Sequence, residues 1–230
     1  QDNRNILQIV LNESLSVAPK LTDDQLAALA VTFFCKYTMH TGTGNHQMLA
    51  DLFNHFVQPF SSKLSKNRAC YQHLEFSGCG SISMGSSSLQ QIYGKKYHGL
   101  FLKGFDREEI ERREISVGED HRFFIPCLND AAKLQVRANN VEELTEFMDE
   151  QNIPDEDKPK IKALFNLNKM NDDEIKDKIV SLCPHMSNIF DVWESSPLKN
   201  FTLTSVGIAI GHANIKRLVG EFSDLSIWIN

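Results

Sequence analysis

The sequence lacks the long apolar runs and basic clusters that identify many membrane and nucleic-acid-binding proteins. No apolar run approaches the roughly 20 residues of a membrane-spanning helix, so we expect no membrane partner. The first residues, Gln-Asp-Asn-Arg-Asn, have no basic stretch followed by an apolar core and do not form a signal peptide. No stripe of Lys and Arg is present, which argues against nucleic-acid binding.

Cysteine is scarce and scattered, and this excludes two further classes of site. An odd number of cysteines without a Cys-x-x-Cys pair suits neither a disulfide framework nor a zinc site. The plain interpretation is reduced, mostly buried thiols in a cytoplasmic protein. The five are Cys35, Cys70, Cys79, Cys127 and Cys183.

Histidine does not form a metal-binding pattern either. The chain has 8 His, but no His-Glu-x-x-His motif and no pair four residues apart on a helix. The segment Gly118–His121 places two carboxylates beside a His, but adjacent side chains point in different directions. We interpret it as a surface turn, and we predict neither a metal nor another cofactor.

What the sequence does have is Phe and a localised acidity. There are 15 Phe against 4 Tyr and 2 Trp, and Phe has no polar group to keep it near water. We therefore expect most of these rings in a sizeable core. Residues 141–178 hold 12 Asp and Glu against 6 Lys and Arg, so this segment accounts for the whole net charge of -6. It is the natural surface for a protein partner, although most charged runs are only solvated faces.

Periodicity and capping signals predict an α+β domain that is mainly α. Helical spacing of apolar residues predicts helices near 6–17, 23–40, 46–60 and 204–219. Alternation predicts strands near 98–104, 122–127, 133–138 and 225–230, which would form a small, mostly antiparallel sheet. Capping signals at Thr22–Gln25, Asn140–Glu143 and Asn171–Glu174 mark helix starts. We expect one domain over 1–230, with an acidic helical sub-lobe at 141–183.

The Gly/Ser segment 77–88 is the first candidate site. Its backbone amides could form an anion-binding nest, with Gly78, Gly80, Ser83 and Gly85 as candidate ligand-binding residues. The spacing matches neither a phosphate-binding loop nor a dinucleotide fingerprint. Two side chains are candidate nucleophiles: Ser81, in a partial match to a nucleophile elbow, and Cys79, between two glycines. A plain connecting loop is the simpler interpretation.

The helix predicted at 204–219 carries the second candidate site. At about 100° per residue it is apolar on two opposite faces, with His212 and Lys216 on a narrow polar stripe between them. Gly207 and Gly211 would let another backbone approach closely. His212 is either a core histidine with a satisfied hydrogen bond or, with Lys216, the lining of a small pocket.

Several phrases in the chain resemble an uncharacterised family of bacterial cytoplasmic proteins. They are Leu15–Tyr37, Tyr97–Phe105, Val206–Arg217 and Leu225–Ile229. Members of that family carry a further helical region upstream, so the resemblance implies that this chain is the C-terminal domain of a longer protein. It assigns no catalytic or binding residue.

These observations favour a non-enzymatic interaction or sensing module that acts with an upstream region. The motivation is a set of good core and capping signals without an assembled catalytic set. We expect a protein partner or self-association, and a small-molecule ligand is possible. The alternative is a small-molecule-binding or hydrolase-like domain in which the segment 77–88, with Cys79 and Ser81, meets His212 in one cleft.

Overall fold

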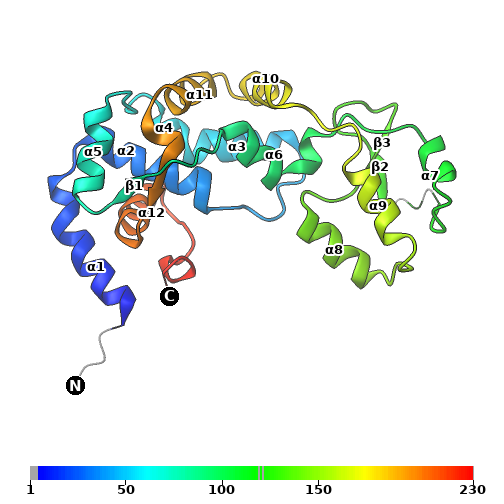
Figure 1. Cartoon of the computed structure of the whole chain (residues 1–230), viewed down its shortest axis with the longest axis horizontal. Helices are drawn as coiled ribbons and strands as arrows, with labels where there is room; N and C mark the ends of the chain where they lie inside the picture. Colours follow the sequence, from blue (N-terminus) through cyan, green and yellow to red (C-terminus); the bar gives the residue numbers. More distant parts are fainter. Residues whose placement is uncertain (1–4, 119, 121, 230) are drawn as a thin grey trace. The chain divides into compact units, whose positions relative to one another are not determined.

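The computed structural model describes residues 5–118, 120 and 122–229, and its fold is α+β and mainly α, as predicted (Figure 1). The chain divides into two compact units, each described here by itself. Unit 1 comprises Gln1–Met39, Ala50–Leu89 and Ile179–Asn230, and unit 2 comprises His40–Leu49 and Gln90–Lys178. The acidic segment 141–178 is thus part of a larger unit that also contains residues 90–140. None of the described helices is both long enough and apolar enough to cross a membrane.

Unit 1 is a helical assembly with one two-stranded antiparallel sheet. In that sheet Gly80 pairs with Leu203 and Ile82 with Phe201. Its strands are β1 (Gly80–Ile82) and β4 (Phe201–Leu203). Its helices are α1 (Ile6–Val17), α2 (Asp23–Thr32), α4 (Gln58–Ser61), α5 (Arg68–Phe76), α11 (Met186–Ser195) and α12 (Ser205–Val219). Its short helical turns are η1 (Ala18–Lys20), η2 (Phe33–Tyr37), η4 (Pro197–Asn200) and η5 (Leu225–Ile227). Residues of α3 (His46–Phe56), α6 (Leu89–Lys96) and α10 (Asp172–Leu182) belong to both units.

Helix α12 is the centre of unit 1, and two glycines allow it to be so. It packs against α2 and α1. A Cβ at Gly207 would lie 1.8 Å from the backbone oxygen of Cys79, and one at Gly211 would lie 2.7 Å from the oxygen of Leu29. The prediction that these glycines admit another backbone is confirmed. The predicted two-faced pattern of the helix is wrong at Leu218, which is 41% exposed.

The predicted helices at 23–40 and 46–60 are both interrupted, the second beside a proline. The first changes at Phe33 from α-helix to the π-helical turn η2 and ends at Tyr37. The second ends at Phe56, and Pro59 lies in the first turn of the separate helix α4. A proline has no backbone N–H to donate, so it is accommodated at a helix start rather than in an interior.

The strand predicted at 225–230 is wrong, because residues 225–227 form the helical turn η5. The carboxylate of Asp224 accepts the backbone N–H of Ser226 at 2.8 Å and so caps this turn. Trp228 then donates its indole N–H to the oxygen of Tyr37 at 2.8 Å and packs edge-on against Phe33. Asn230 lies outside the described residues. The chain end therefore contributes an aromatic side chain to unit 1 instead of a strand.

Unit 2 is built on a separate hydrophobic core and a second two-stranded sheet. Its remaining elements are η3 (His98–Phe101), α7 (Glu108–Arg112), β2 (Phe124–Pro126), β3 (Leu134–Val136), α8 (Val141–Glu150) and α9 (Lys158–Phe165). The predicted strands at 122–127 and 133–138 are confirmed in shortened form, with Phe124 opposite Val136. The core joins side chains of the acidic segment, such as Leu144 and Phe165, to Leu102 and Phe124.

The strand predicted at 98–104 is wrong, because carbonyl groups there accept from side chains instead of from a neighbouring strand. Residues His98–Phe101 form the turn η3, and extended pairing is limited to isolated bridges such as Leu102 with Lys169. Gly99 donates its N–H to the oxygen of Asn139 and accepts from the amide of Gln135. A Cβ at Gly99 would lie 2.0 Å from the oxygen of Ala138, so glycine is required for this contact.

Candidate functional site

The Gly/Ser segment 77–88 is held to η4 and β4 by hydrogen bonds and strand pairing. Ser83 donates its backbone N–H to the oxygen of Asn200 at 3.0 Å, and Asn200 donates its side-chain amide to the oxygen of Gly85 at 3.0 Å. The amide of Gly78 donates to Glu75, and Gly80 lies within β1. The amides of Gly78 and Ser83 therefore already have partners and are not free N–H donors for an anion nest.

The candidate nucleophiles of this segment lie in different surroundings. Cys79 is fully buried, and burial raises the pKa of its thiol to about 11. A thiol with this pKa is protonated at neutral pH and is a poor nucleophile. Ser81 is exposed on β1, opposite Thr202. These observations do not supply the activated nucleophile that a hydrolase-like site requires.

His212 is a core histidine with a satisfied hydrogen bond. Its Nε2 lies 2.6 Å from the oxygen of Ser223, to which it donates, and its ring contacts Phe33, Phe222 and Trp228. His212 is buried whereas Lys216 is exposed, so the stripe predicted for the two side chains is divided between the interior and the surface. The backbone of Cys79 reaches α12 at Gly207, not at His212.

Lys36 is a half-buried cation for which the sequence predicted no role. Its ammonium group donates to the backbone oxygens of Leu198, Lys199 and Phe201 at 3.3, 3.0 and 2.8 Å and lies 5.2 Å from the ring centre of Trp193. Burial lowers its pKa to about 8. All three donors of the ammonium group are used, so we assign Lys36 a structural role. The sequence feature that could have identified Lys36 is a single Lys in an otherwise apolar predicted helix.

A polar cavity lies in unit 2, between α6 and the first turn of α10. It has a volume of about 340 Å³, at the lower end of the range of small-molecule sites. One wall is apolar, with Phe101, Met170 and Ile175. The remaining lining residues are mostly polar: Gln90, Gln91, Gly94, Lys95, His98, Val141, Asn166, Lys169 and Asp172.

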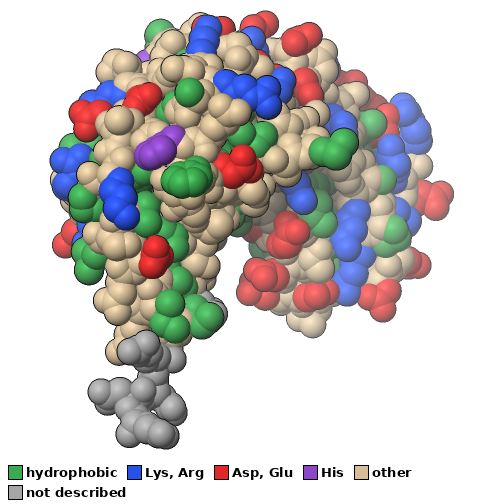
Figure 2. Space-filling view, turned by 60° about the vertical axis from the view of Figure 1, so that its left-hand side comes forward, with side chains coloured by type: hydrophobic (Ala, Val, Ile, Leu, Met, Phe, Trp, Pro, Cys, Tyr) green, Lys and Arg blue, Asp and Glu red, His purple; other side chains and the backbone are tan. Residues whose placement is uncertain are grey.

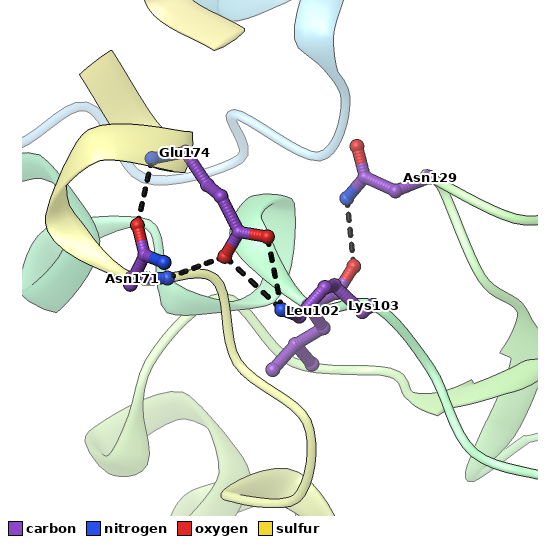
Figure 3. Close-up of polar contacts among 5 residues, drawn as sticks. All are labelled: Leu102, Lys103, Asn129, Asn171 and Glu174. Atoms are coloured by element: carbon purple, nitrogen blue, oxygen red, sulfur yellow. Dashed lines mark hydrogen bonds and ion pairs between the residues drawn. The ribbon is translucent and has the colours of Figure 1, made fainter. Parts of the chain in front are cut away.

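The wall formed by α10 is fixed to residues 101–103. Met170 donates its N–H to the oxygen of Phe101 at 2.8 Å. Glu174 and Asn171 form the predicted capping box, with bonds of 2.8 and 2.9 Å. The same Glu174 carboxylate pairs with Lys103 at 3.0 Å through both oxygens (Figure 3). Cap and ion pair together hold the start of α10 in place beside the cavity.

Asn129 and His46 hold residues 100–102 from other parts of unit 2. Asn129 donates to the oxygens of Leu100 and Leu102 at 2.9 and 2.8 Å, the second of which Figure 3 shows. Nε2 of His46 lies 2.8 Å from the same Leu100 oxygen. Burial lowers the pKa of His46, so the ring is a neutral donor at neutral pH. The backbone behind the cavity is therefore rigidly held.

Among the residues that line the cavity, the charge balance is positive, with the charged side chains exposed, and one buried acceptor is unsatisfied. Neither Lys95 nor Lys169 forms an ion pair with a described carboxylate, and the one lining carboxylate, Asp172, accepts from Gln91 at 3.2 Å. Oε1 of Gln90 is buried without a hydrogen-bond partner among the described residues. Burial lowers the pKa of His98, so this ring adds no charge at neutral pH.

A second concavity lies in unit 1 and is apolar. It has a volume of about 420 Å³ and is lined by α1, α2 and α12. Its lining residues are Leu11, Ser14, Leu15, Ala18, Leu26, Ala209, Ile210, Ala213, Asn214 and Arg217. Several apolar side chains of α1 are exposed, among them Ile6, Ile9 and Leu15 at 56, 52 and 75%, and of these Leu15 lines the groove. Figure 2 shows hydrophobic side chains gathered near the N-terminal end of α1.

Metal chemistry has no assembled ligand set within the part of the chain that the structure describes. No three His, Cys, Asp or Glu side chains there converge closely enough to hold an ion. Glu119 and His121 of the turn Gly118–His121 lie outside the described residues.

Comparison with known proteins gives one result. Neither the curated proteins nor the solved structures contain a match to this chain. A protein-family model matches residues 1–229, and the description it carries, ":-like", names no activity. Because that match extends over nearly the whole chain, the chain belongs to this family.

Proposed function

We propose that the chain is a non-enzymatic sensing module that binds a small molecule in the cavity between α6 and the start of α10. The observation that carries this proposal is the cavity itself: an apolar wall, several polar side chains and a buried acceptor on Gln90 without a partner. This combination is typical of ligand sites. The candidate nucleophiles lie elsewhere, with Cys79 buried and protonated, so binding without chemistry is the function that the geometry supports best.

Filling the cavity tests the proposal. A Cβ at Gly94 meets only the terminal carbon of Ile175, at 2.8 Å, so Gly94→Ala requires a small movement of one flexible side chain. Gly94→Leu places a larger group at the same wall. We expect wild type and Gly94→Ala to bind members of a small-fragment library in ligand-observed NMR, and Gly94→Leu to lose at least tenfold in affinity.

Thermal unfolding of the three proteins is the control, because equal transitions show that the variants are folded. The proposal is overturned if no fragment binds the wild type. It is also overturned if the fragments that bind do so equally well to folded Gly94→Leu.

Self-association through α1 is a second candidate function, and the face that surrounds the apolar groove favours it. The projecting side chain of Leu15, which is 75% exposed, lies on the same face as the groove that it helps to line. A face with both knobs and a hole can complement a second copy of itself about a twofold axis, since each contact is then made twice. We therefore name a second copy of this chain as the partner.

Leu15→Glu is expected to convert a dimer to a monomer in sedimentation velocity, because it places a charge in the apolar contact. Leu218→Glu is the matched control, since Leu218 is 41% exposed on α12 and does not line the groove. A wild type that stays monomeric at the highest soluble concentration contradicts this candidate, as does a dimer that Leu15→Glu leaves intact.

A further inference from the structure

We infer that the ligand of the unit 2 cavity is a small organic anion with an apolar body, an inference that rests on the proposed function. The cavity has two chemically different parts. Phe101, Met170 and Ile175 supply an apolar wall, whereas the ammonium groups of Lys95 and Lys169 supply positive charge. A molecule that matches both parts has a hydrocarbon or aromatic body and an acidic group.

The charges around the cavity favour an anion over other ligands of the same size. The two ammonium groups have no carboxylate partner among the described residues, whereas the acidic groups nearby are engaged. Asp172 accepts from Gln91, and Glu174 is paired with Lys103. An incoming carboxylate or phosphate therefore meets two unpaired cations and one carboxylate, a balance that attracts negative charge.

The neighbouring histidine does not alter this balance. Nε2 of His98 donates to the oxygen of Phe165 at 2.8 Å, and its ring lies against the Phe165 ring. Burial first, and then the charge of Lys169, lower the pKa of His98, although its bond to Phe165 acts in the opposite direction. The ring is neutral at neutral pH, and the lysines remain the cations of the site.

Asp172 distinguishes between ligand classes, because replacing its carboxylate changes the affinity in opposite directions for anions and for cations. For an anion, the Asp172 carboxylate is repulsive, so Asp172→Asn tightens binding. For a cation, or for a zwitterion whose ammonium group sits at Asp172, the same substitution weakens binding. Asp172 lies in the first turn of α10, and asparagine has nearly the same shape, so we expect the helix start to stay in place in Asp172→Asn.

A matched series of four probes tests the ligand class: 3-phenylpropionate, its neutral amide, 3-phenylpropylamine and phenylalanine. They share one ring and chain and differ in charge. We expect titration calorimetry at low salt to give 3-phenylpropionate an affinity at least tenfold above that of the amide, with weaker binding as salt increases. Asp172→Asn should raise the affinity for 3-phenylpropionate about threefold.

Two lysine substitutions locate the effect, and a third controls for net charge. Lys95→Gln and Lys169→Gln should each lower the affinity for 3-phenylpropionate severalfold and leave that for the amide unchanged. Lys162→Gln removes the same charge from α9 outside the cavity lining and should change neither affinity. If the protein prefers the amide, the amine or the zwitterion, the inference is overturned and the proposed function stands. The same holds if none of the four probes binds although library fragments bind the cavity. Failure of the library itself overturns both.

Discussion

Replacing Gly207 with alanine is expected to lower the free energy of unfolding of unit 1 by about 3 kcal/mol, because the new methyl group would overlap the backbone of Cys79. The Cβ would lie 1.8 Å from the Cys79 oxygen, and that carbonyl also accepts the N–H of Thr204 at 3.1 Å. A carbonyl held in this way cannot move aside as a flexible side chain can. Alanine favours a helix over glycine by about 1 kcal/mol, which is too little to offset the overlap.

Urea unfolding followed by tryptophan fluorescence measures this effect in the relevant unit, since both tryptophans, Trp193 and Trp228, belong to unit 1. Gly85→Ala is the matched control. A Cβ at Gly85 has only the Ser83 hydroxyl oxygen near it, at 4.0 Å, so the free energy of unfolding should change by less than about 0.5 kcal/mol. Equal stability of the two variants would show that α12 does not approach Cys79 as described.

Asp157→Ala is expected to destabilise unit 2 by about 3 kcal/mol, because it leaves several buried or half-buried donors without an acceptor. The Asp157 side chain is fully buried. Its carboxylate accepts from the backbone N–H of Ser116 at 2.9 Å, from the Ser116 hydroxyl, and from the ammonium group of Lys160 at 3.2 Å. No apolar replacement can satisfy these donors.

The matched control is Asp155→Ala, two residues earlier. The Asp155 carboxylate is 96% exposed and pairs with Lys158 at 2.9 Å, and exposed pairs of this kind contribute at most about 1 kcal/mol. Circular dichroism during urea unfolding compares the two variants. If Asp155→Ala costs as much as Asp157→Ala, burial of the Asp157 carboxylate is not the source of its effect.

The same carboxylate predicts a pH dependence with a definite sign. Burial alone would raise the pKa of Asp157, but the bonds from Ser116 and Lys160 outweigh it and hold the pKa below its ordinary value of 3.8. The unfolded chain therefore binds the proton more readily than the folded one. The stabilisation that the ionised Asp157 carboxylate contributes is fully present well above pH 3.8 and is lost as the pH falls through the folded pKa. The difference in the free energy of unfolding between wild type and Asp157→Asn should therefore shrink in acid.

Local signals in the sequence determined the helix starts. The capping boxes predicted at Thr22–Gln25 and Asn171–Glu174 are present, as the 3.0 Å bond from the Thr22 N–H to Gln25 shows for the first. Asn140 likewise accepts the N–H of Glu143 at 2.8 Å. These contacts join residues three apart, so the information that specifies them is local. The same holds for the alternating strands β2 and β3, whose pairing spans a short connection.

Only the tertiary structure decided the features that depend on distant partners. Strands β1 and β4 are three residues each and pair across more than a hundred positions, so neither has a periodic signal of its own. Residues 98–101 read as a strand but form a turn, because side chains such as Gln135 and Asn129 take the carbonyl groups that a ladder would use.

For the candidate site too, some features followed from the sequence and others only from the tertiary structure. The sequence by itself determined a mainly helical α+β protein with buried thiols and with glycines where α12 meets another backbone. It could not place the cavity, because Lys95 and Lys169 are ordinary surface lysines in the sequence and become one site only when α6 and the start of α10 are brought together. Burial and convergence of side chains are properties of the packed chain, and these decide which polar residues are available to bind a ligand.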